Sequence, residues 1–150
     1  MGKSIPERVS EAREGKNPAV ICRVPSGWAV MCDAQFLHGY TILLADPVVA
    51  SINDLDLKQR AAYLRDMTVI GDALLEVTAA FRINYGILGN TDTYLHAHII
   101  PRYQSEPEKY LKGLPWSYPK RIAEAVPFDL EREKEFMHQL TAAIQNFYKG

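Results

Sequence analysis

The segment Tyr94–Arg102, which reads YLHAHIIPR, holds two of the four histidines of this 150-residue chain. In a β-strand, alternate side chains point to the same face and lie about 6.6 Å apart. Tyr94, His96 and His98 are therefore predicted to share one face, with apolar side chains on the other. An imidazole has an unperturbed pKa of about 6.5, so at neutral pH it can act as a nucleophile, an acid or a hydrogen-bond donor.

Three interpretations fit this histidine pair. The first is that both are ordinary polar residues on a half-exposed sheet face. The second is a metal site, but zinc usually takes three or four protein ligands, and no other spacing in the sequence supplies them. The third is covalent catalysis at phosphorus, in which one imidazole attacks and the other binds the phosphate oxygens. The residues around the pair favour the third interpretation.

The surrounding motif is GILGNTDT (residues 86–93) before the strand and Pro101-Arg102 after it. With these residues the chain resembles the histidine triad (HIT) superfamily of nucleotidyl hydrolases and transferases. The signature of that superfamily is three histidines alternating with apolar residues, then two apolar residues and usually Pro-Arg. HAHIIPR matches its second half. Gly39–Ala45 and Asp54-Leu55 also resemble family segments, so the resemblance covers roughly residues 19–102.

The resemblance implies a role for each matched residue. His96 falls on the middle histidine, which attacks the α-phosphorus and holds the nucleotidyl group as a phosphoramidate. His98 falls on the third histidine, which contacts the phosphate oxygens. Asn90 occupies the place of a polar residue, commonly glutamine, that also reaches the phosphate. No metal or cofactor is required by this scheme.

Three positions depart from the family pattern. Tyr94 stands where the first histidine would be, which leaves the orientation of the attacking ring open, although a phenol can still form a hydrogen bond. Tyr40 replaces a histidine on an earlier strand. Asp92 stands where an apolar residue is usual.

The family also holds the ribose hydroxyls with an acidic or amide residue on an early strand, between apolar walls around the base. Asp33 is the candidate for this role, and the alternative is a plain turn aspartate. An ungapped comparison places Cys32 at that position instead. Trp28 and Phe36 are candidates for the base pocket, although aromatic residues on strands are often part of the core.

The other two histidines and the late aromatic residues are less easily assigned. His38 is predicted to be a loop residue, and His138 a solvated residue on the last helix. Trp116, Tyr118 and Arg121 lie in a proline-rich segment, where they could close over a leaving group or pack against a neighbouring subunit.

Hydrophobic spacing and turn residues predict the elements around these motifs. Gly89-Asn90 is typical of a tight turn between paired strands, and the proline-rich segment 103–128 is predicted to be an ordered loop. The expected order is a helix at 6–15, strands at 19–24, 28–32 and 40–45, a helix of about 24 residues capped by Asp56, strands at 82–88 and 94–101, and a helix capped by Asp129. This order predicts an α+β fold, an antiparallel sheet with a long helix packed on one side.

The composition sets limits on function. With 47% hydrophobic residues, the chain is expected to form one HIT-like domain over 1–150, with an N-terminal extension (1–18), a core (19–102) and a long loop plus C-terminal helix (103–150). Seventeen basic and 18 acidic residues nearly balance, so neither nucleic acid nor a membrane surface is an expected partner. The polar N-terminus lacks a signal-peptide pattern, so a cytoplasmic location and reduced Cys22 and Cys32 are expected.

The sequence thus predicts an enzyme that hydrolyses or transfers a nucleotidyl group at the α-phosphate. Its substrate class would be a dinucleoside polyphosphate, a nucleoside phosphoramidate or a similar nucleotide derivative. The alternative is a nucleotide-binding protein with little or no turnover, acting as a sensor or partner module. The resemblance also implies a symmetric homodimer.

Overall fold

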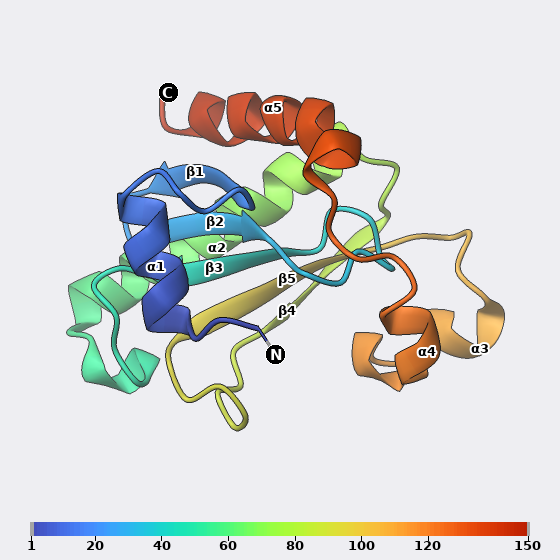
Figure 1. The fold of residues 1–150 in the computed structure, drawn as a ribbon, viewed down its shortest axis with the longest axis horizontal. Coiled ribbons are helices and arrows are strands. Elements are labelled where there is room, and N and C mark those ends of the chain that lie inside the picture. Colours follow the sequence, from blue (N-terminus) through green and yellow to red (C-terminus); the bar gives the residue numbers. More distant parts are fainter. Residues whose placement is uncertain (1, 150) are drawn as a thin grey trace.

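The computed structural model, which describes residues 2–149, contains one five-stranded antiparallel sheet in the order β1-β2-β3-β5-β4 (Figure 1). The strands are β1 (Val20–Val24), β2 (Gly27–Met31), β3 (Thr41–Ala45), β4 (Arg82–Gly86) and β5 (His96–Arg102). The helices are α1 (Ile5–Arg13), α2 (Leu57–Val77), α3 (Glu108–Leu111), α4 (Lys120–Ala123) and α5 (Leu130–Phe147), with 3-10 turns η1 (Ile52–Asp54) and η2 (Pro115–Ser117). The predicted α+β class is confirmed.

The three longer helices begin at capping residues. Ser4 and Asp129 accept the backbone N–H groups of the first turns of α1 and α5. Asp56 caps α2 and forms the predicted capping box with Gln59. Helix α2 spans 21 residues, slightly fewer than expected. Within residues 2–149, no helix combines the length and the apolar character needed to cross a bilayer.

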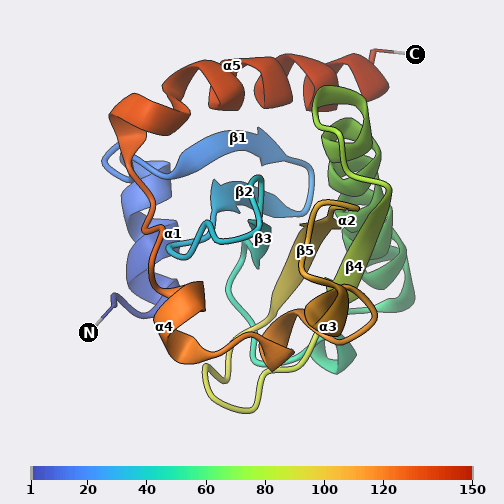
Figure 2. The same cartoon turned by 90° about the vertical axis from the view of Figure 1, so that its right-hand side faces the viewer.

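The sheet lies between helices on its two sides (Figures 1 and 2). Helix α2 covers one face, α5 lies beside α2 and over β1, and α1 lies on the opposite face. Fully buried side chains fill the space between the sheet and α2, and each leucine or isoleucine among them stabilises the fold by about 1.5–3 kcal/mol. They include Leu43, Ala97, Ile99, Tyr63, Ile70 and Leu74. Because side chains alternate along β5, this packing leaves His96 and His98 on the face away from α2.

The connection between β4 and β5 differs from the prediction. The strands pair in antiparallel register with Gly86 opposite His98, so a nine-residue loop (87–95) joins them instead of a tight turn. Gly89 has a positive φ of 78°, as glycines in tight turns often do, but it lies within this nine-residue loop. The backbone N–H of Leu95 donates to the carbonyl of Val49 and not to β4. Strand β5 therefore begins at His96 rather than at Tyr94, and β4 ends two residues earlier than expected.

The proline-rich segment 103–128 is ordered, as predicted, but it contains the short helical turns α3, η2 and α4 rather than a plain loop. It forms a small lobe next to the C-terminal end of β5 (Figure 1). The buried guanidinium of Arg102 fixes the start of this lobe. It donates to Glu106, to Asn84 and to the carbonyls of Tyr110 and Gly113 at 2.8–2.9 Å.

Candidate active site

The ring of His96 is held by the backbone just before β5. Its Nδ1 lies 2.7 Å from the carbonyl oxygen of Tyr94. A carbonyl can only accept a hydrogen bond, so Nδ1 carries the proton and donates it. In a neutral ring the other nitrogen, Nε2, then keeps its lone pair. His96 is thereby prepared to act as a nucleophile.

His98 lies beside His96 on the same face of β5. The two ring centroids are 4.9 Å apart, with the rings nearly perpendicular. The Nδ1 of His98 lies 2.7 Å from the hydroxyl of Tyr40. Burial, together with the neighbouring His96, lowers the pKa of His98 to about 4. His98 is therefore neutral at physiological pH.

The hydroxyl of Tyr40, which contacts His98, also lies near two other side chains. The thiol of Cys32 and the indole of Trp116 both approach its hydroxyl. Burial raises the pKa of the Tyr40 phenol far above its usual value, so the hydroxyl keeps its proton. Burial also raises the pKa of Cys32 to about 11, which keeps the thiol neutral. The group that contacts His98 is therefore an uncharged phenol, which lies next to an uncharged thiol.

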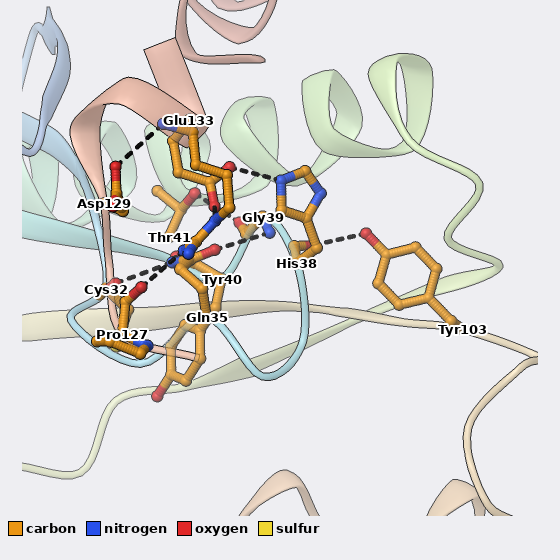
Figure 3. Close-up of polar contacts among 11 residues, drawn as sticks. Cys32, Gln35, His38, Gly39, Tyr40, Thr41, Tyr103, Pro127, Asp129 and Glu133 are labelled. Carbon is orange, nitrogen blue, oxygen red and sulfur yellow. Dashed lines mark hydrogen bonds and ion pairs between the residues drawn. The ribbon is translucent and has the colours of Figure 1, made fainter. Parts of the chain in front are cut away.

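The loop between β2 and β3 is fixed by a buried glutamine (Figure 3). The side-chain amide of Gln35 donates to the carbonyls of Cys32 and Tyr40, at 2.9 and 2.8 Å, and accepts from the N–H of Gly39. His38 is a loop residue, as predicted. Its Nε2 lies 2.7 Å from the buried carboxylate of Glu133 on α5, and its carbonyl accepts from the hydroxyl of Tyr103. His38 thus attaches this loop to α5 and to the 103–128 lobe.

A small cavity of about 170 Å³ opens in front of His96. Cys32 and Asp33, the two predicted ribose candidates, both line it. Three charged residues that were not predicted as site residues line it as well: Lys3, Arg8 and Asp92. Arg8 forms a two-pronged ion pair with Asp33, with N–O distances of 2.8 and 3.3 Å.

Only one of these three residues carried a signal in the sequence. Asp92 was visible as a departure from the family pattern. Nothing in the pattern pointed to Lys3 and Arg8, because they reach the cavity only through the packing of α1 against the sheet.

Four predicted site residues lie elsewhere or contribute differently. Asn90 is exposed in the 87–95 loop and does not line the cavity of His96. The Trp28 indole donates to Asp46, away from this cavity. The Phe36 ring packs against Tyr118, 5.0 Å between centroids. Tyr94 contributes its carbonyl, while its side chain is 38% exposed.

The metal-site interpretation finds no support in the described part of the chain. Among residues 2–149, no cluster of three or more histidine, cysteine, aspartate or glutamate side chains is placed to hold a metal ion.

No protein-family model and no curated protein matches the chain, but several solved structures do. A histidine triad protein from Bradyrhizobium japonicum superposes with a TM-score of 0.68 at 24% identity, over 83% of this chain and 89% of that one. A hypothetical histidine triad nucleotide-binding protein from Sulfolobus tokodaii superposes with a TM-score of 0.70 at 14% identity, over 93% of this chain and 92% of that one. The diadenosine triphosphate hydrolase of Plasmodium falciparum superposes with a TM-score of 0.56 at 17% identity, over 86% of this chain and 78% of that one. The chain therefore has the histidine triad fold.

Proposed function

We propose that this protein is a nucleotidyl hydrolase or transferase that acts at the α-phosphate of a nucleotide derivative, with His96 as its nucleophile. The observation that carries the proposal is the hydrogen bond from His96 Nδ1 to the Tyr94 carbonyl. This bond selects the tautomer with a free lone pair on Nε2, in a ring that lines a cavity. The fold likeness to a histidine triad nucleotide-binding protein and to a diadenosine triphosphate hydrolase agrees with this chemistry.

The proposed reaction has two steps. His96 Nε2 attacks the α-phosphorus, a nitrogen–phosphorus bond forms, and the bond to the leaving group breaks with its electron pair going to that group. The imidazole becomes cationic in this intermediate, and the Tyr94 carbonyl stabilises it by accepting from Nδ1–H. Water or another acceptor then attacks phosphorus, the nitrogen–phosphorus bond breaks, and the acceptor loses a proton. His96 returns to its neutral form.

His98 is proposed to bind the phosphate oxygens. If Tyr40 donates its hydroxyl proton to His98 Nδ1, then Nε2 carries the other proton and can donate it to an equatorial oxygen. The low pKa of His98 means that it serves as a neutral donor and not as a cation. For Asn90 to donate a second hydrogen bond to the phosphate, the 87–95 loop that carries it would have to move toward His98.

Two observations bear on the alternative function, which is nucleotide binding with little or no turnover. The cavity at His96 measures about 170 Å³, whereas sites for small molecules usually measure about 300–1,000 Å³. Its ribose candidate Asp33 is already engaged by Arg8. A nucleotide would have to displace this ion pair to reach Asp33. Binding and turnover are therefore both measured.

The test is incubation with adenosine phosphoramidate and with diadenosine triphosphate, followed by rapid quenching and mass spectrometry. The proposal expects turnover of at least one substrate and an adenylylated His96. His96→Ala should lose at least about a thousandfold in rate and form no adduct. His138→Ala, which removes an exposed histidine from α5, is the matched control and should keep full activity. Binding without turnover or adduct in the unmodified protein would establish the alternative.

A symmetric homodimer is proposed together with this function. Strand β4 forms one edge of the sheet, and within residues 2–149 no strand pairs with its outer side. Phe81 and Tyr85 are exposed along it. An edge strand presents unpaired backbone N–H and C=O groups, which can pair with a second copy. Light scattering after size-exclusion chromatography should give twice the chain mass of 16.9 kDa.

A further inference from the structure

The contact between Tyr40 and His98 depends on what packs around the Tyr40 ring. The backbone of Tyr40 is fixed, because its carbonyl accepts from the N–H of Cys32 at 2.9 Å and from the side-chain amide of Gln35 at 2.8 Å (Figure 3). The hydroxyl lies at the far end of the side chain, 2.7 Å from Nδ1 of His98. A small change in the χ1 torsion of Tyr40 would move the hydroxyl out of hydrogen-bonding distance. The neighbouring side chains therefore determine whether the contact is kept.

Phe36, in the same loop between β2 and β3, packs against the Tyr40 ring. The two rings meet in a T-shaped arrangement, with centroids 6.2 Å apart and an interplanar angle of 71°. Aromatic pairs prefer this arrangement, and it stabilises them beyond the burial of their surfaces. Phe36 also packs against the small apolar cluster of Leu37, Tyr40 and Ile100. It does not line the cavity at His96, so it is not placed to contact a substrate there.

Tyr118 brings the 103–128 lobe into contact with Phe36. The centroids of these two rings are 5.0 Å apart, at an angle of 63°. The hydroxyl of Tyr118 donates to the carboxylate of Glu106 at 2.6 Å, and this carboxylate pairs with Arg102 at 2.9 Å. The side chains of Glu106 and Arg102 are only 4% and 3% exposed, so water competes little with these contacts. The Tyr118 ring is thereby held in place against Phe36.

These contacts form a path that begins and ends on β5. Arg102 and His98 lie on the same face of that strand, because side chains alternate along it. The path consists of Arg102, Glu106, Tyr118, Phe36, Tyr40 and His98. Both of its ends are fixed by one strand, and closely packed rings between fixed ends have little room to shift. Loss of a ring from this path would leave space into which the Tyr40 side chain can move.

We propose that Phe36, supported by Tyr118, is a positioning residue that keeps the Tyr40 hydroxyl on Nδ1 of His98. The inference rests on the proposed function, because it concerns the residue that would bind the phosphate oxygens. With the hydroxyl in place, His98 carries its proton on Nε2 and can donate it to a phosphate oxygen. Without the hydroxyl, the proton can occupy Nδ1, and Nε2 then turns a lone pair toward an anionic oxygen. Phe36 thus acts on the reaction through Tyr40 and His98, without touching the substrate.

The kinetic test removes the ring of Phe36 in two backgrounds. In the otherwise unmodified protein, Phe36→Leu should lower kcat for adenosine phosphoramidate by roughly 5-fold, because one aromatic contact is lost. KM should stay within about twofold, because Phe36 does not line the cavity. In the Tyr40→Phe background the hydroxyl is already absent, so Phe36→Leu should change kcat by less than about twofold. Equal losses of kcat in both backgrounds would overturn the proposal, because Phe36 would then act without the Tyr40 hydroxyl.

Two further variants serve as controls. Phe36→Tyr keeps an aromatic ring at the same position, so its kcat should stay within about twofold of the unmodified protein. Phe147→Leu removes an exposed ring from α5 and should leave kcat unchanged. The proposal fails if Phe36→Tyr loses as much activity as Phe36→Leu, or if Phe36→Leu loses none.

A spectroscopic measurement separates this inference from the proposed function, because it needs no turnover. Nitrogen-15 NMR of a histidine ring distinguishes the two neutral tautomers, and His98→Gln assigns the signals of His98. At neutral pH the unmodified protein should show a single tautomer of His98, with the proton on Nε2. Phe36→Leu should give a mixture of both tautomers, whereas Phe147→Leu should match the unmodified protein. If neither test substrate is turned over but this difference appears, the catalytic proposal fails and the positioning role survives.

Tyr118→Leu tests the same inference from the side of the lobe, and it replaces Phe36→Leu if that variant does not fold. It removes the ring that supports Phe36 and should produce a smaller change of the same kind in the His98 signals. Folded variants whose His98 signals match those of the unmodified protein would exclude the positioning role. Turnover by the unmodified protein together with this result would leave the proposed function standing and remove the inference alone.

Discussion

The hydroxyl of Tyr40 contacts Nδ1 of His98, which leaves Nε2 as the nitrogen that we propose to face a phosphate. It lies 2.7 Å from His98 Nδ1 and keeps its proton because burial raises the pKa of the phenol. Tyr40→Phe keeps the ring and removes only this contact. A neutral hydrogen bond is worth about 1 kcal/mol, so we expect kcat to fall by roughly 5- to 10-fold and the melting temperature to fall by only about 2–4 °C. Tyr110→Phe, a phenol on α3 outside the cavity of His96, should keep the full rate; an equal loss there would argue against the positioning role.

The pKa of His98 predicts a pH dependence of stability. The folded protein has a His98 pKa of about 4 because of burial and the nearby His96, while the unfolded chain has the ordinary value of about 6.5. Between these values the unfolded chain binds a proton that the folded chain does not. Stability from this residue is therefore fully present above about pH 6.5 and is lost as the pH falls toward 4.

His98→Gln isolates this effect, because glutamine does not titrate. From pH 7 to pH 5, the free energy of unfolding should fall more for the unmodified protein than for the variant, by on the order of 1 kcal/mol. Urea titrations of both proteins at the two pH values measure the difference. Parallel losses would show that His98 does not have a depressed pKa.

At this scale the sequence predicted that His96 and His98 share one face of a strand, but not what surrounds them. His96 and His98 share a face because side chains alternate along a strand, and that rule needs no tertiary information. The hydrogen bond to the Tyr94 carbonyl and the contacts of Lys3 and Arg8 depend on how the 87–95 loop and α1 pack. No local pattern in the sequence encodes such contacts.

Strands β2 and β3 approach each other closely at Gly27. A Cβ added there would lie 1.9 Å from the carbonyl oxygen of Leu44, which is backbone and cannot swing aside. Gly27→Ala should therefore force the two strands apart and lower the free energy of unfolding by about 3 kcal/mol or more. Since Leu44 pairs with His96 on β5, the cavity should also be disturbed.

A second glycine provides the control. Gly15 has a φ of 73° and nothing within 4 Å of an added Cβ. Asparagine tolerates this backbone region, so Gly15→Asn should cost less than about 1 kcal/mol. Thermal unfolding of the two variants distinguishes steric exclusion from a general intolerance of glycine replacement.

Elements were predictable where the chain carries a local signal. The caps Asp56 and Asp129 mark the starts of α2 and α5, because an N-terminal turn needs an acceptor for its free N–H groups. Gly89-Asn90 was misleading. The pair is typical of tight turns, but Leu95 bonds to Val49 across the fold, and this tertiary contact draws the 87–95 loop away from β4.

At the scale of the whole molecule, the site depends on the sheet being held rigidly against two helices. Asp66 of α2 is one point where three distant segments meet. Its buried carboxylate accepts from the backbone N–H of Ser26 at 2.8 Å and from the hydroxyl of Tyr148 at 2.6 Å. It also pairs with Arg65, whose side chain is about half exposed. The turn before β2, helix α2 and the C-terminal end of α5 are thereby joined at one residue.

Removal of this carboxylate should loosen all three segments together. Asp66→Ala leaves the N–H of Ser26 and the Tyr148 hydroxyl without their acceptor, and we expect a loss of about 2–3 kcal/mol, or roughly 5–10 °C in Tm. Asp72→Ala removes an exposed carboxylate from the same helix and should shift Tm by less than about 2 °C. Differential scanning calorimetry measures both. If the two variants melt alike, the three segments are held by apolar packing alone; if Asp66→Ala melts early as a single cooperative transition, the sheet and both helices unfold as one unit.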